Sequence, residues 1–135
     1  MGVLMNFEYQ MLAILTVGFI LAWMPSSLGK LKSYGLKWVA SNRDPVKGSE
    51  LLPWAGRAER AYANLKDYYP GFAVAIILLG ILGRFDQGTQ YAAGIYVVSR
   101  LAHFVVYLAG WSAPRTVAFL TGLVANLYLL GKILF

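Results

Sequence analysis

Three polar side chains, Arg60, Asn64 and Asp67, lie on one face of a predicted helix. At 3.6 residues per turn their spacing places them on the same side. Their segment runs directly into residues 72–79, which are apolar. Ionisable groups near lipid are costly unless they meet partners inside the protein or in a water-filled cavity. This face therefore predicts a polar site at the membrane end of a helix.

A second polar stripe follows later in the chain. It contains Tyr96, Arg100, His103 and Tyr107, spaced by four, three and four residues. The next apolar segment opens with Pro114, Arg115 and Thr116. If neighbouring segments run in opposite directions, the end of the second stripe, Arg115 and the Arg60 face share one membrane depth. The sequence thus predicts that polar groups from three helices converge in the inner leaflet.

These residue types suit a polar ligand with a net negative charge. Arginine presents a planar fork that matches a carboxylate. The Asn64 amide can both donate and accept hydrogen bonds, as peptide groups require, and Asp67 can hold an ammonium. Glutathione, a γ-linked tripeptide, meets this description, although composition alone does not single it out.

Each of these side chains also has a purely structural interpretation. Arg115 at a helix end can extend its charge to the interface, and Tyr96 and Tyr107 can be interfacial aromatics. His103 alone is more often a packed residue than a catalyst. We expect Arg100 to form a structural ion pair with Asp67, which neutralises both. Taken together, these structural interpretations do not explain why the polar groups of three helices lie at the same depth in the membrane.

Composition places the chain among helical membrane proteins. Of its 135 residues 59% are hydrophobic and 13% charged, too few charges for a soluble domain with so large a core. The absence of cysteine excludes a protein thiolate, and a single histidine provides no metal site. The basic residues flank apolar segments, which argues against a nucleic-acid-binding protein.

We expect one all-α domain over residues 1–135, a transmembrane four-helix bundle. The helices are predicted at about 7–28, 54–82, 89–109 and 114–134, with a loop at about 40–53. Pro25 predicts a kink or break in the first helix, and residues 30–37 are expected to be helical at the interface. Most lysines and arginines flank the first loop. The positive-inside rule therefore predicts a cytoplasmic loop and non-cytoplasmic termini.

The polar motifs resemble those of the MAPEG family, membrane-associated proteins in eicosanoid and glutathione metabolism. The resemblance is carried by residues 60–67 followed by Pro70, by residues 100–107, and by residues 113–116. It covers about residues 54–125. It implies a homotrimer in the lipid bilayer, with a glutathione site between subunits near the cytoplasmic face. We expect a bacterial-type member, in the inner membrane.

The resemblance also implies roles for individual residues. Arg115 would stabilise the glutathione thiolate, with Thr116 as a neighbouring hydroxyl. The residues that would bind glutathione or shape its site are Arg60, Asn64, Asp67, His103 and Tyr107. A further cation would come from Lys30, Lys37 or Arg43, between which the sequence does not decide.

The chain departs from the family pattern at three positions. Asp67 stands where the family usually has glutamate, Ala63 replaces an arginine of the prostaglandin synthase, and Phe119 replaces a tyrosine of some members. The last two favour a general glutathione transferase or peroxidase, acting on hydrophobic electrophiles or lipid hydroperoxides, over an eicosanoid synthase. The alternatives are a non-catalytic lipid- or glutathione-binding protein of the same fold and a small transporter.

Overall fold

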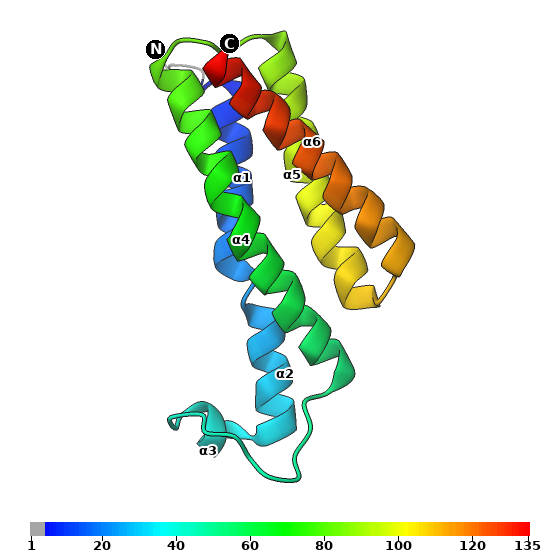
Figure 1. Ribbon diagram of the computed structural model, residues 1–135. Helices are drawn as coiled ribbons and strands as arrows, with labels where there is room; N and C mark the ends of the chain where they lie inside the picture. The colour runs from blue at the N-terminus through cyan, green and yellow to red at the C-terminus, as the bar shows by residue number, and fades with distance from the viewer. Residues whose placement is uncertain (1–4) are drawn as a thin grey trace.

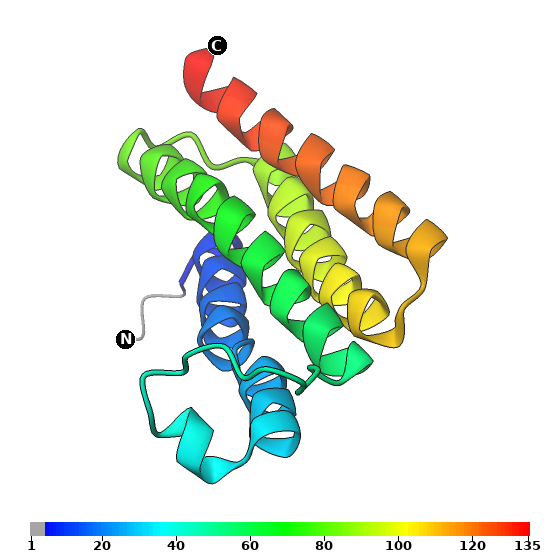
Figure 2. The ribbon, with the colours of Figure 1, turned by 60° about the horizontal axis from the view of Figure 1, so that its bottom comes forward.

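The computed structural model describes residues 5–135, and every regular element in this part of the chain is helical. The elements are α1 (Phe7–Leu21), α2 (Met24–Tyr34), α3 (Leu36–Val39), α4 (Pro53–Ile81), α5 (Gln87–Ala109) and α6 (Ser112–Leu134). The all-α class is confirmed. In Figure 1, α4 crosses in front of α1, which packs against both α4 and α5. Figure 2 shows α2 on one side of α4 and the α5–α6 pair on the other.

Three helical stretches are long and apolar enough to cross a membrane. They are Phe7–Tyr34, which combines α1 and α2, and the single helices α5 and α6. The expected fourth span, α4, is not among them. Its 29 residues include an apolar second half, but its first half carries charged residues such as Arg57, Glu59 and Lys66.

The first span is longer than expected and interrupted. The helix predicted to end near residue 28 continues to Tyr34, which agrees with the interfacial helix expected over residues 30–37. The predicted break at Pro25 is confirmed, because α1 ends at Leu21 and α2 begins at Met24. Proline clashes with the carbonyl four residues earlier, here that of Leu21. Gly35, with φ of 81°, then ends α2.

Small residues bring the helices close together. A methyl group on Gly29 of α2 would lie 2.1 Å from Cβ of Ala55 on α4, so these two backbones are nearly in contact. Ala58 and Ala61 continue this buried side of α4. Deeper in the core, Phe72 of α4 stacks on Tyr96 of α5 with ring centroids 4.2 Å apart. Small residues allow close approach where lipid supplies no hydrophobic drive between helices.

The start of α1, the start of α5 and the end of α6 lie at one end of the molecule (Figure 1). Glu8 of α1 accepts a hydrogen bond of 2.6 Å from the Thr89 hydroxyl. Lys132 of α6 pairs with Asp86 at 2.6 Å. The Asp86 carboxylate also caps α5 by accepting from the Thr89 backbone N–H, at 2.8 Å. The opposite end is closed by Arg57, whose Nε donates to the Leu108 carbonyl at 2.9 Å.

The cap at Asp86 makes stability depend on acidity. The hydrogen bond from Lys132, followed by that from the Thr89 backbone N–H, lowers the pKa of Asp86. A carboxyl whose pKa is lowered on folding stabilises the fold fully above its unfolded pKa of about 3.9. This contribution disappears as the pH falls through the folded-state pKa. We expect the Tm in detergent to fall below about pH 4, and less steeply for Asp86→Asn.

The matched control is Asp44→Asn. The side chain of Asp44 is exposed in the loop and has no hydrogen-bond partner among residues 5–135. This variant should keep the wild-type acid profile. Identical profiles for wild type and Asp86→Asn would show that the cap contributes nothing.

Candidate functional site

Arg100 joins three helices at the centre of the molecule. Its side chain lies in α5 and is 2% exposed. Its Nη2 donates a short hydrogen bond to Oδ1 of Asn64 on α4. The guanidinium carbon lies 5.3 Å from the ring centre of Tyr68 on α4 and 5.9 Å from that of Phe119 on α6. These four side chains, the Arg100 cluster, bring α4, α5 and α6 together.

The expected ion pair between Arg100 and Asp67 does not form within the chain. Asp67 is exposed, and among residues 5–135 it makes no salt bridge to Arg100. Asp67 lies about 4.5 Å further along α4 than Asn64 and is turned by about 60° around the helix axis. Asn64 therefore faces the guanidinium, while the short aspartate side chain points away from it. The acceptor of Arg100 is a neutral amide.

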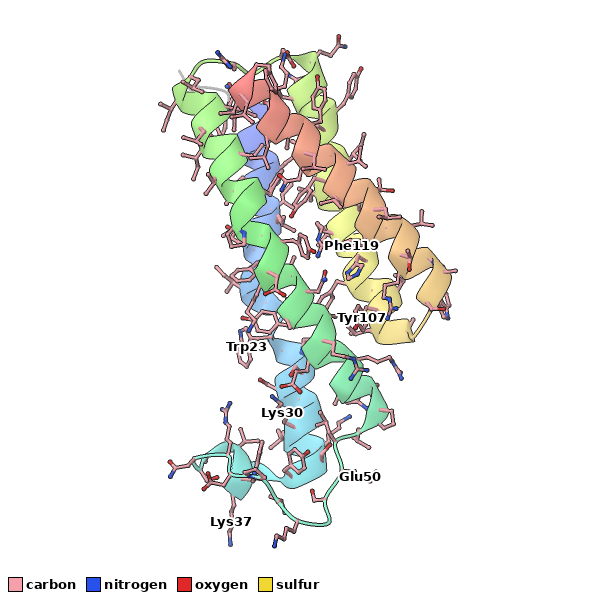
Figure 3. The ribbon with its side chains drawn as sticks, in the orientation of Figure 1. Trp23, Lys30, Lys37, Glu50, Tyr107 and Phe119 are labelled. Carbon is pink, nitrogen blue, oxygen red and sulfur yellow. The ribbon has the colours of Figure 1, made fainter. Side chains whose placement is uncertain are left out.

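His103, Tyr107 and Arg115 form a second group, the α5–α6 cluster, beside the Arg100 cluster. His103 is buried, and its ring meets that of Tyr107 edge-on at 5.5 Å and that of Phe119 at 6.2 Å. The guanidinium of Arg115 lies 4.7 Å above the Tyr107 ring. Figure 3 shows Tyr107 and Phe119 on the side of α5 and α6 that faces α4. The second polar stripe and the start of α6 therefore meet.

Three of the predicted site residues lie on the surface of the single chain. Arg60 and Asp67 are exposed on α4, and Thr116 is exposed on α6. The Thr116 hydroxyl donates to the Ser112 carbonyl one turn earlier, at 3.2 Å. The predicted site therefore has a buried part around Arg100 and His103 and an open part that solvent or a neighbouring molecule can reach.

A polar recess, the α2–α4 recess, lies between α2 and α4, with Arg43 of the loop at its edge. Its volume is about 500 Å³, and its charged lining residues are Lys30, Arg43, Glu59 and Lys66. Lys30 pairs with Glu59 at 2.6 Å. Of the three cations between which the sequence did not decide, Lys30 and Arg43 line this α2–α4 recess. Lys37 lies away from it on α3, at the far end of the molecule (Figure 3).

Sequence reasoning missed one wall of the site, Tyr68. Its ring faces the Arg100 guanidinium, and its backbone carbonyl accepts a 2.9 Å hydrogen bond from the Tyr96 hydroxyl. The signal was available, because Tyr68 follows Asn64 by four residues and so shares its face of the helix. Aromatic faces stabilise cations through their quadrupole, which explains an aromatic residue at this position.

The arrangement is suited to binding and stabilising anions. The Arg100 cluster and the α5–α6 cluster share the Phe119 ring, which lies 5.9 Å from the Arg100 guanidinium and 6.2 Å from the His103 ring. Arg115 lies nearer the end of the helices, on the Tyr107 ring. Guanidinium groups bind carboxylates and thiolates without giving up a proton. With no cysteine in the chain, any thiolate chemistry requires a thiol from a bound molecule.

Asn64 should matter more for stability than Asp67. Asn64→Leu removes the acceptor of a buried guanidinium, which costs about 1–3 kcal/mol. Asp67→Leu alters an exposed side chain and should change the free energy of unfolding much less. Thermal unfolding of both variants in detergent measures the difference. If Asp67→Leu is equally damaging, an ion pair with Arg100 exists that the single chain does not contain.

A comparison with protein-family models gives a match over nearly the whole chain. The model described as the MAPEG family matches residues 9–135, which include both clusters and the α2–α4 recess. Searches of curated proteins and of solved structures return no significant match. The match agrees with the apolar helices that are long enough to cross a membrane and with the polar motifs on α4, α5 and α6. This chain therefore belongs to the MAPEG family of membrane proteins, whose functions are broadly related to glutathione.

Proposed function

We propose that the protein is a membrane-bound glutathione transferase that also acts as a glutathione peroxidase. The observation that carries the proposal is Arg115 above Tyr107, next to buried His103 and the Arg100 cluster. These side chains surround an anion-binding site built from three helices. In a family related to glutathione, a natural occupant of such a site is the anionic tripeptide.

Binding and catalysis are divided among these residues. Arg60, Asn64, Asp67, His103 and Tyr107 bind glutathione or shape its site. Arg115 lies beside the sulfur. A thiol with a pKa of about 8.5 is only a few per cent thiolate at neutral pH. A cation within reach lowers such a pKa by roughly 1–3 units, so Arg115 raises the fraction of reactive anion. Tyr107 or Thr116 donates a hydrogen bond to the sulfur.

The thiolate attacks a hydrophobic substrate that arrives from the bilayer. With an aryl halide, a carbon–sulfur bond forms and halide leaves. With a lipid hydroperoxide, the sulfur takes the terminal oxygen and the lipid alcohol leaves. A second glutathione then converts the sulfenic acid to a disulfide and water. The protein contributes charge and position, and the co-substrate contributes the nucleophile.

A neighbouring subunit completes the site in our proposal. Arg60, Asp67 and Thr116 are exposed in the single chain, so a tripeptide there would remain largely open to water. A homotrimer would cover it, and the α2–α4 recess of the adjacent subunit offers cations for a second carboxylate. Lys30 is the best placed, because its pairing with Glu59 orients the ammonium. The basic loop lies on the cytoplasmic side of the membrane, which we take to be a bacterial inner membrane.

The role of Arg115 can be tested with glutathione and a chromogenic aryl halide. At pH 7, Arg115→Gln should lower kcat about 10- to 30-fold, with a smaller change in glutathione affinity. Losing a pKa shift of 1–3 units returns the thiolate fraction to the few per cent of the free thiol, from a wild-type fraction that cannot exceed one. Absorbance at about 240 nm, where the thiolate absorbs, should fall in parallel. Arg84→Gln, at the opposite end of the helices, is the matched control.

Three results would point elsewhere. Unchanged kcat in Arg115→Gln would remove this residue from the mechanism. Tight glutathione binding without turnover in the wild type would indicate a non-catalytic binding protein of the same fold. Ion flux in liposomes without glutathione binding would indicate a transporter.

The contribution of the α2–α4 recess to glutathione binding can be tested at Lys30. Lys30→Gln should weaken glutathione binding about tenfold, the effect of losing one charge-assisted contact of about 1.4 kcal/mol. Lys37→Gln removes a similar charge outside the recess and should leave affinity unchanged. Equilibrium binding to the purified protein measures both. Equal effects of the two variants would reduce the role of Lys30 to general electrostatic attraction.

A further inference from the structure

The side chain of Arg57 joins the start of α4 to the end of α5. Its Nε donates a hydrogen bond of 2.9 Å to the Leu108 carbonyl. An α-helix leaves its last four carbonyl groups without partners inside the helix. At the end of α5, the carbonyls of Val106 and Tyr107 accept from backbone N–H groups of the turn that follows. The partner of Leu108 comes instead from another helix, and its positive charge is favourable at a helix C-terminus.

The turn beside Arg57 is short. Only Gly110 and Trp111, the α5–α6 turn, separate α5 from α6, which begins at Ser112. Gly110 has φ of 83°, a conformation that glycine adopts without strain. A methyl group on Gly110 would lie 3.4 Å from Nε of Arg57, so the arginine lies directly against this turn. Because the connection is so short, the end of α5 determines where α6 begins.

The position of Arg115 depends on this turn. Arg115 is the fourth residue of α6, and its guanidinium lies 4.7 Å from the centre of the Tyr107 ring in the last turn of α5. Tyr107 directly precedes Leu108, whose carbonyl Arg57 binds. The attraction between a cation and an anion falls with distance. The effect of Arg115 on a thiolate therefore depends on where the α5–α6 turn places it.

We propose that Arg57 is a positioning residue, which fastens the α5–α6 turn to α4 and so holds Arg115 beside the sulfur of the bound thiol. This inference rests on the proposed transferase function. Arg57 lies three residues before Arg60 and seven before Asn64, on the same face of α4. The helix that carries two of the proposed glutathione-binding side chains thus also determines the place of the activating cation.

Three substitutions at Arg57 separate its hydrogen bond from its charge. Arg57→Gln has no charge, but its amide nitrogen takes the position of Nε and can donate to the Leu108 carbonyl. Arg57→Met has neither a donor nor a charge. Arg57→Asn keeps the amide but is one methylene too short to reach the carbonyl, and it serves as a second test if Arg57→Met fails to fold. We expect Arg57→Gln to resemble the wild type and the other two variants to be impaired.

The first measurement is the pH profile of kcat for glutathione and an aryl halide, with the protein in phosphatidylcholine nanodiscs. In Arg57→Met and Arg57→Asn, the apparent pKa of the bound thiol should rise by about one unit, part of the 1–3 units that a nearby cation supplies. The kcat at pH 7 should then fall about three- to tenfold and approach the wild-type value at alkaline pH. KM for glutathione should change little, because Arg57 acts through Arg115.

The second measurement is hydrogen–deuterium exchange of the backbone amides of residues 106–116, without glutathione. Exchange should be about tenfold faster in Arg57→Met and Arg57→Asn, the effect of losing one hydrogen bond to a charged group. The matched control is Arg84→Met. Arg84 donates in the same way to the carbonyls of Lys132 and Ile133 at the end of α6. Because this contact lies at the opposite end of the molecule, its loss should leave both measurements unchanged.

Equal impairment in all three Arg57 variants would show that only the charge matters, and would overturn the proposal. Wild-type pH profiles in Arg57→Met and Arg57→Asn would also overturn it. If exchange changes as expected but the wild type conjugates no glutathione, the transferase function is wrong, while the fastening of the α5–α6 turn by Arg57 is supported.

Discussion

One buried positive charge determines how the second half of the molecule is arranged. The Arg100 guanidinium lies in a region of low dielectric, where an unsolvated cation must find partners within the protein. No single helix supplies them. The amide comes from Asn64 on α4, and the aromatic faces come from Tyr68 on α4 and Phe119 on α6. Satisfying this charge therefore requires α4, α5 and α6 to meet at one level.

Pro25 and Pro70 show that the effect of a proline on a helix depends on its surroundings. Pro25 separates α1 from α2, because α1 ends at Leu21 and α2 begins at Met24. Pro70 lies inside α4 without ending it. There, packing against the neighbouring helix continues across the proline, because two residues before it the Tyr96 hydroxyl of α5 donates to the Tyr68 carbonyl.

Some polar residues of the candidate site are buried and others are exposed, as would be expected if several copies of the chain formed the site together. Buried Arg100 and His103 give the site its charge and shape, while exposed Arg60 and Asp67 remain available to a ligand or another subunit. The α2–α4 recess with Lys30 is on a different face of the same chain. Two incomplete faces on one chain are what a site shared between copies requires.

The sequence alone was sufficient for the helical class, for α5 and α6 to within two residues, and for the polar stripe. Apolar length and 3.6-residue periodicity determine these features locally. The sequence was not sufficient for the partner of Arg100. Asn64 and Asp67 share a face of α4, so periodicity favours neither. The choice depends on how far α4 slides and turns against α5, which the packing between the two helices sets, including the stack of Phe72 on Tyr96. If α4 slid along α5 by about 4.5 Å, the rise of three residues, Asp67 would take the place of Asn64 beside Arg100 and form an ion pair with it. Only the tertiary packing decides between these two arrangements.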